Sequence, residues 1–154
     1  MMRKLVVTAY IAVITALPAN HALGADGLIA VESPHNVATT VDKLVAVLES
    51  KGMNIFARIN HAEGASKAGM DLRPTEVLVF GNPKVGTPLM LCSQSFAIDL
   101  PQKMLAWQDE NGKVHLGYND PTHLKSRHKT EGCDEVLGKV SGALANFAAA
   151  ATKP

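Results

Sequence analysis

The sequence lacks the features that mark a nucleic-acid-binding protein. Lysine and arginine number 15 and aspartate and glutamate 14 in the 154-residue chain, so there is no excess of positive charge to meet a phosphate backbone. The single tryptophan, Trp107, is followed by polar Gln108 in a short apolar stretch. This alternation favours a core or interface position over a platform for stacked bases. We therefore expect no nucleic-acid partner.

Signatures of catalysis and metal binding are also missing. The chain has no Cys-x-x-Cys or His-Glu-x-x-His motif, and Ser93 and Ser95 are not in a Gly-x-Ser-x-Gly turn. His123 and His128 are five residues apart, so a helix would not place them on one face. We expect no metal site and no cofactor, although distant histidines and cysteines leave an assembled metal site as an alternative.

The stretch LVFGNPKVGTPLM, residues 78–90, looks like a phosphate-binding loop but lacks its key residue. Gly81 and Gly86 have the required spacing, yet Thr87 stands directly after Gly86 where the loop needs lysine. Pro83 also removes a backbone N–H that would contact phosphate. The sequence therefore argues against an NTPase.

The first 25 residues have the layout of a secretory signal peptide. Two basic residues precede an apolar stretch of 13 residues, 5–17, which is short for a membrane span, and small residues follow. We expect cleavage after Ala25, with Ala19 and Ala22 as alternative sites and an uncleaved anchor as the alternative interpretation. Residues 26–154 then form a single periplasmic or secreted domain with a net charge of −1. No later segment is apolar enough to span a membrane.

Only two cysteines are present, Cys92 and Cys133. An even number in an exported protein favours a disulfide, which would close a loop of roughly 40 residues. Two separate buried thiols are the alternative.

The pattern of apolar residues predicts an α+β domain. Strands are expected at 28–33, 53–59, 75–80, 103–108 and 113–118, with a turn at Asn111-Gly112 between the last two. One long helix should begin after Asn36 and end at Gly52, and another should begin at Asp134, with an alanine-rich end that frays. Short helices are expected near 61–70 and 122–129.

A further helix is expected from about Pro88 to Ile98, with Thr87 as its N-cap. Its free N–H groups, with Lys84 nearby, would suit a small anion.

The two long helices should cover one face of a largely antiparallel five-stranded sheet. The other face must then be solvated or covered by a partner, which suggests a homodimer.

Three stretches resemble the bacterial domain-of-unknown-function family 302: residues 57–90, the stretch IDLPQKMLAWQDENGKVHLGYNDP, and LKSRHK. The resemblance extends over roughly residues 28–148. It implies a fold similar to the TATA-binding-protein fold and a dimer, but no activity. His115, where we expect an aromatic residue, and the two cysteines depart from the family pattern.

The sequence leaves the function open. Our first hypothesis is a non-catalytic module that binds a small ligand, with an anion as one candidate. The alternatives are an acid–base or hydrolytic enzyme that uses His61 or His128, and a structural or accessory dimer. The candidate ligand-binding residues are polar side chains from the motif-bearing stretches and strand ends: Arg58, His61, Lys84, Thr87, Tyr118, Asn119 and His128.

Overall fold

A computed structural model describes residues 25–154 of the chain. The signal peptide expected over residues 1–25 lies outside this part, apart from Ala25. Five strands form one sheet in the order β1-β5-β4-β3-β2, and every neighbouring pair is antiparallel. The strands are β1 (Leu28–Ser33), β2 (Asn54–Asn60), β3 (Thr75–Gly81), β4 (Gln102–Gln108) and β5 (Val114–Asn119). The α+β fold expected from the sequence is confirmed.

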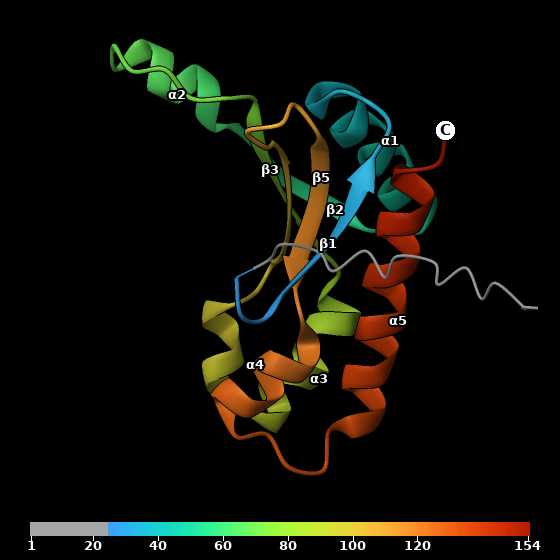
Figure 1. Cartoon of the computed structure of the whole chain (residues 1–154). Helices are drawn as coiled ribbons and strands as arrows, with labels where there is room; N and C mark the ends of the chain where they lie inside the picture. The colour runs from blue at the N-terminus through green and yellow to red at the C-terminus, as the bar shows by residue number, and fades with distance from the viewer. Residues whose placement is uncertain (1–24) are drawn as a thin grey trace, which may run out of the picture.

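Two long helices cover one face of the sheet. These are α1 (Val37–Ser50) and α5 (Asp134–Ala151), and they lie side by side to the right of the strands in Figure 1. The shorter helices are α2 (His61–Lys67), α3 (Pro83–Cys92), the 3₁₀ helix η1 (Gln94–Ile98) and α4 (Pro121–His128). Helix α2 projects away from the body, while α3 and α4 lie at its opposite end.

The core lies between the sheet and the two long helices. Val41 and Leu44 of α1, with Leu78, Met104 and Leu116 of the central strands, have no exposed surface. Burying a side chain of this size stabilises the fold by about 1.5–3 kcal/mol, so this layer holds the strands and helices in fixed relation.

The ends of α1 follow the rules used to predict them. The Asn36 side chain accepts a hydrogen bond from the backbone N–H of Thr39 at 2.8 Å, and Gly52 has a φ of +69°.

Helix α5 does not fray at its alanine-rich end. Ala148 and Ala151 are at most 1% exposed. Small side chains allow α5 to approach α1 closely, so tertiary contact holds a segment that would be marginal alone.

Helix α3 begins five residues earlier than expected. Its N-cap is Asn82, whose side chain accepts from the Lys84 N–H at 2.9 Å, and Pro83 takes the first position. Thr87 and Pro88 therefore lie inside the helix, and the expected helix from Pro88 to Ile98 is wrong. The part of the phosphate-loop-like stretch from Pro83 to Met90 forms the first turns of α3. It does not form an open loop around an anion.

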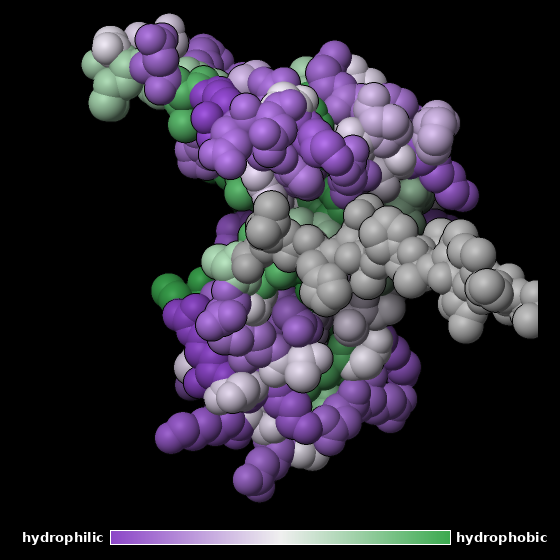
Figure 2. Space-filling view, in the orientation of Figure 1, coloured by the Kyte–Doolittle hydropathy of each residue, from purple (hydrophilic) through white to green (hydrophobic). Residues whose placement is uncertain are grey.

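The second face of the sheet carries an apolar row across all five strands. The strand register places Ile59, Val77, Leu105, Gly117 and Ala30 side by side. Ile59 is 44% exposed and the other four are half-buried or buried. This face opens into the hollow between α2 and the helices at the other end, where Figure 2 shows hydrophobic surface.

Candidate functional site

An apolar pocket of about 290 Å³ lies between α3, α5 and the sheet. Its volume is at the lower end of the ~300–1,000 Å³ typical of small-molecule sites. Nine of the eleven residues of FGNPKVGTPLM, 80–90, line it. The sequence stretch that looked like a phosphate loop therefore builds a pocket of a different chemical character.

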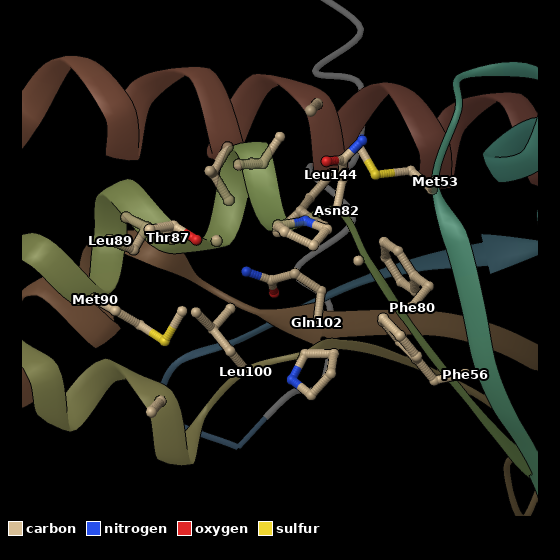
Figure 3. A pocket seen from close by; sticks show the side chains of 18 of the residues that line it. Met53, Phe56, Phe80, Asn82, Thr87, Leu89, Met90, Leu100, Gln102 and Leu144 are labelled. Carbon is tan, nitrogen blue, oxygen red and sulfur yellow. The ribbon is translucent and has the colours of Figure 1, made fainter.

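The pocket walls come from four parts of the fold. Leu89 and Met90 of α3 face Leu100, which precedes β4, while Phe80 and Phe56 close the end nearest the sheet (Figure 3). From α5 come Val140, Ala143, Leu144 and Phe147. Phe80 and Phe147 pack edge to face with ring centroids 6.3 Å apart. The rigid core elements thus shape the pocket, which suits a preformed site.

Polar groups in the pocket are few and uncharged. The lining contains the side chains of Asn82, Thr87 and Gln102, and no charged side chain. The Gln102 amide lies in the middle of the close-up, and the Thr87 hydroxyl is directed toward the same space (Figure 3). Asn82 donates to the Gly52 carbonyl at 3.1 Å. Gln102 and Thr87 are therefore the groups best placed to bind a polar part of a ligand.

The predicted site residues do not gather in this pocket. Of the seven, only Thr87 lines it, and Lys84 lines a neighbouring hollow between α3 and α5. That hollow shares Met53, Val85, Val140 and Ala143 with the pocket. An anion would therefore find Lys84 beside the pocket rather than within it.

Arg58 is engaged in ion pairs that hold α1 to the sheet. Its Nε donates to the Glu76 carboxylate at 2.6 Å and its Nη1 to that of Asp42 at 2.5 Å. Glu76 is 6% exposed, so the guanidinium neutralises a charge that burial would otherwise penalise. The hydrogen bond to Glu76 raises the pKa of Arg58. These contacts give Arg58 a structural role.

Three other predicted residues are near the ends of β5 and β2. Tyr118 is 4% exposed within the core, and burial raises the pKa of its phenol. Asn119 ends β5 beside Leu28 of β1. His61 is the first residue of the projecting α2 and is exposed. These three side chains belong to different environments, and the convergence that a cleft would need is absent.

His128 is in a hydrogen-bonded chain at the opposite end of the molecule from α2. Its Nε2 lies 2.6 Å from the Asp99 carboxylate and its Nδ1 lies 2.9 Å from the Ser95 hydroxyl. The ring also packs on Phe96, with centroids 4.5 Å apart. The sequence marks His128 as a candidate but not its partners, because they are 29 and 33 residues away and no motif links them to it.

The structure joins Cys92 and Cys133 by a disulfide, with Cα atoms 6.3 Å apart. Cys92 ends α3 and Cys133 immediately precedes α5. Two walls of the apolar pocket are therefore covalently connected at one end. Among residues 25–154 no cluster of three potential metal ligands occurs, and no helix there is long and apolar enough to cross a membrane.

The sequence model of the family called domain of unknown function DUF302 matches residues 29–147. The chain belongs to the DUF302 family. A DUF302 protein of Bacillus stearothermophilus with a known crystal structure has the same fold. Its TM-score is 0.75 at 20% identity, and the match covers 84% of this chain and all of the other.

Closer relatives in sequence are two Brucella proteins named as fluoride-specific ion channels. One is from Brucella suis biovar 1 and the other from Brucella abortus biovar 1, and both are 43% identical over 127 residues. The match covers 80% of this chain but only 50% and 47% of those proteins. This DUF302 chain thus spans about half the length of the curated relatives it matches.

Proposed function

We propose that the apolar pocket of this DUF302 protein is a non-catalytic site that binds a small, mainly apolar and uncharged molecule. The observation that carries the proposal is the pocket built by the stretch FGNPKVGTPLM, whose lining is apolar and contains no charged side chain. A bare anion that entered this pocket would lose its hydration and find no positive charge to replace it, which costs a large amount of free energy. The ligand we expect therefore has an apolar body and one hydrogen-bonding group.

The hydrogen-bonding group is the basis of selectivity in this proposal. The Gln102 amide both donates and accepts, and the Thr87 hydroxyl does the same. Neither side chain makes a hydrogen bond to another group in the described part of the chain, so both are available to a ligand carbonyl or hydroxyl. An aliphatic or aromatic ketone, amide or alcohol of about the pocket's volume matches these requirements.

A pair of glycine variants tests the pocket. The Cβ added in Gly86→Leu would point at Leu100, 3.6 Å away, so the new side chain would occupy the pocket. Gly138→Leu makes the same change at an exposed position of α5, where an added Cβ would have no neighbouring atom of another segment within 4 Å. We expect the affinity for the neutral fluorescent probe N-phenyl-1-naphthylamine to fall about tenfold or more in Gly86→Leu and to stay unchanged in Gly138→Leu.

Melting curves of both variants serve as the control for folding. Glycine is less favourable than alanine in a helix by about 0.8–1 kcal/mol, and leucine ranks next to alanine, so neither variant should lose stability through its helix. Equal probe affinity in the wild type and in a folded Gly86→Leu protein would contradict binding at this pocket.

We also propose that the protein is exported and that it acts as a homodimer. Two features support export: the signal-like N-terminal sequence and the disulfide, a bond that persists in oxidising compartments. The dimer is supported by the apolar row Ile59–Val77–Leu105–Gly117–Ala30 on the uncovered sheet face. The occupant we assign to that face is a second copy of this chain.

A role in fluoride handling is a second candidate function. It is favoured by the 43% identity to proteins named as fluoride-specific ion channels. We propose that the channel activity belongs to the half of those relatives that this chain does not match. The DUF302 half is then an accessory module that senses or supplies a molecule the channel system needs.

Growth in fluoride tests this second role. A strain lacking this protein should stop growing at a lower fluoride concentration than its parent, and the gene supplied on a plasmid should restore growth. If the pocket serves this role, Gly138→Leu should restore growth and Gly86→Leu should not. Identical fluoride tolerance of the deletion strain and its parent would contradict the proposal.

A further inference from the structure

Outside the apolar pocket, Ser95, His128 and Asp99 form a continuous chain of hydrogen bonds. The Ser95 hydroxyl lies 2.9 Å from Nδ1 of His128, and Nε2 of the same ring lies 2.6 Å from the Asp99 carboxylate. Ser95 is the second residue of η1, Asp99 directly follows its last residue, and His128 is the last residue of α4. A serine, a histidine and a carboxylate in this order are the parts of a nucleophilic hydrolase.

The direction of each hydrogen bond follows from the chemistry of the groups. An ionised carboxylate only accepts, so Nε2 of His128 carries the proton that Asp99 receives. In the neutral ring Nδ1 is then an acceptor, and the Ser95 O–H must donate to it. The base of the pair therefore points its lone pair at the serine proton, as general-base activation requires.

Packing holds the histidine and the carboxylate in place. The side chains of His128 and Asp99 are 4% and 9% exposed, and the imidazole stacks on Phe96. Arg127 donates to the second oxygen of Asp99 at 3.3 Å. Fixing the ring and its proton in this way is what the third member of a catalytic triad does.

Ser95, in contrast, is exposed and accessible to a substrate. Its hydroxyl lies 2.9 Å from that of Ser93. Because the Ser95 proton is directed at His128, Ser93 must be the donor in this contact. Ser93 thus places a second hydroxyl beside the attacking oxygen, and after rotation this hydroxyl can donate to the substrate's carbonyl oxygen, where negative charge develops in acyl transfer.

The surroundings of Ser95 indicate the kind of acyl group. Residues three apart lie on the same side of a 3₁₀ helix, so Ile98 is next to Ser95 on η1. Ile98 is 71% exposed. An exposed apolar side chain beside the nucleophile fits a short alkyl chain on the substrate.

The geometry points to a second site in this protein, a Ser95–His128–Asp99 triad that hydrolyses esters of short apolar carboxylic acids. Ser95 Oγ bonds to the ester carbonyl carbon while its proton passes to Nδ1 of His128. The carbon–oxygen bond to the leaving alcohol then breaks, and the alcohol takes that proton. Water attacks the acyl-serine with the same proton transfers, which releases the acid and restores Ser95. This inference does not rest on the apolar pocket.

Covalent labelling of the full chain with an alkyl fluorophosphonate tests the triad. The serine oxygen forms a bond to phosphorus, fluoride leaves, and the adduct is read by intact mass and peptide mapping. We expect one adduct on Ser95, none in Ser95→Ala, and labelling as in the wild type in Ser126→Ala, a matched change at an exposed serine of α4. Hydrolysis of p-nitrophenyl butyrate should follow the same pattern.

The Asp99→Asn variant tests whether His128 and Asp99 activate Ser95, or whether Ser95 reacts only because it is exposed. It keeps the size of the side chain but removes the charge that fixes the imidazole, so labelling should slow by roughly 100-fold or more. Melting curves identify any variant that has lost its fold. Wild-type protein that takes no label, labelling at another residue, or equal labelling rates in the wild type and a folded Asp99→Asn protein would each overturn the triad.

Discussion

Removing the disulfide is expected to lower the free energy of unfolding by about 3–4 kcal/mol. Cys92 and Cys133 are 41 residues apart, so the bond restricts a long loop in the unfolded chain. For a domain of this size that loss corresponds to a fall in Tm of roughly 10–15 °C. Thermal unfolding of the Cys92→Ser/Cys133→Ser double variant measures it directly.

Reduction provides the matched control for the disulfide. Dithiothreitol should lower the Tm of the wild-type protein and leave the double variant unchanged. Because the bond connects α3 to α5, the double variant should also bind N-phenyl-1-naphthylamine more weakly below its Tm. Two free thiols in protein purified under oxidising conditions would contradict the expected effect.

Strand positions were predictable because a short apolar run bounded by turn residues is a strong local signal. The run from Val77 to Phe80 in β3 is apolar throughout, and the structure adds the alternation: Glu76, Leu78 and Phe80 are buried while Val77 and Val79 are half-buried. The hairpin at Asn111-Gly112 is likewise local, and Gly112 has the positive φ, +78°, that its position requires. Each of these features depends on a few neighbouring residues.

The start of α3 was not predictable from local rules alone. Asn82-Pro83 and Thr87-Pro88 both have the form of an N-cap followed by proline at the first helical position. A start at the second pair would avoid a proline inside the helix, which costs a hydrogen bond. The earlier start allows Val85, Leu89 and Met90 to face the pocket and core, and this tertiary gain decided between two equal local signals.

The candidate sites were even less predictable from local sequence rules than the start of α3. Arg58 and His128 stood out as polar residues in family-like stretches, but their roles depend on Glu76 and Asp99, which the fold brings within 2.6 Å of each. No spacing rule links Ser95 to His128. The apolar pocket was missed because its lining residues read as ordinary core, and only the relative placement of α3 and α5 leaves space between them.

The second large effect we expect is dissociation of the proposed dimer by Leu105→Lys. Leu105 is on the central strand of the uncovered face, between Val77 and Gly117. Strands of about 20 Å, spaced at about 4.8 Å, give this face a projected area on the order of 500 Å². A standard interface buries about 800 Å² per partner, and the projecting α2 arm can supply the rest, since Met70 and Leu72 beyond it are 61% and 49% exposed.

A lysine at the centre of this face would place an unpaired charge in the interface. Such a charge costs about 2–5 kcal/mol, so the dimer dissociation constant should rise roughly 100-fold or more. Native mass spectrometry at micromolar concentration should show a dimer for the wild type and a monomer for Leu105→Lys. Leu91→Lys, the same substitution at a site 82% exposed on α3, should remain dimeric. A monomeric wild type, or a Leu105→Lys protein that still dimerises, would contradict the assignment, because a charge is tolerated on this face only where water reaches it.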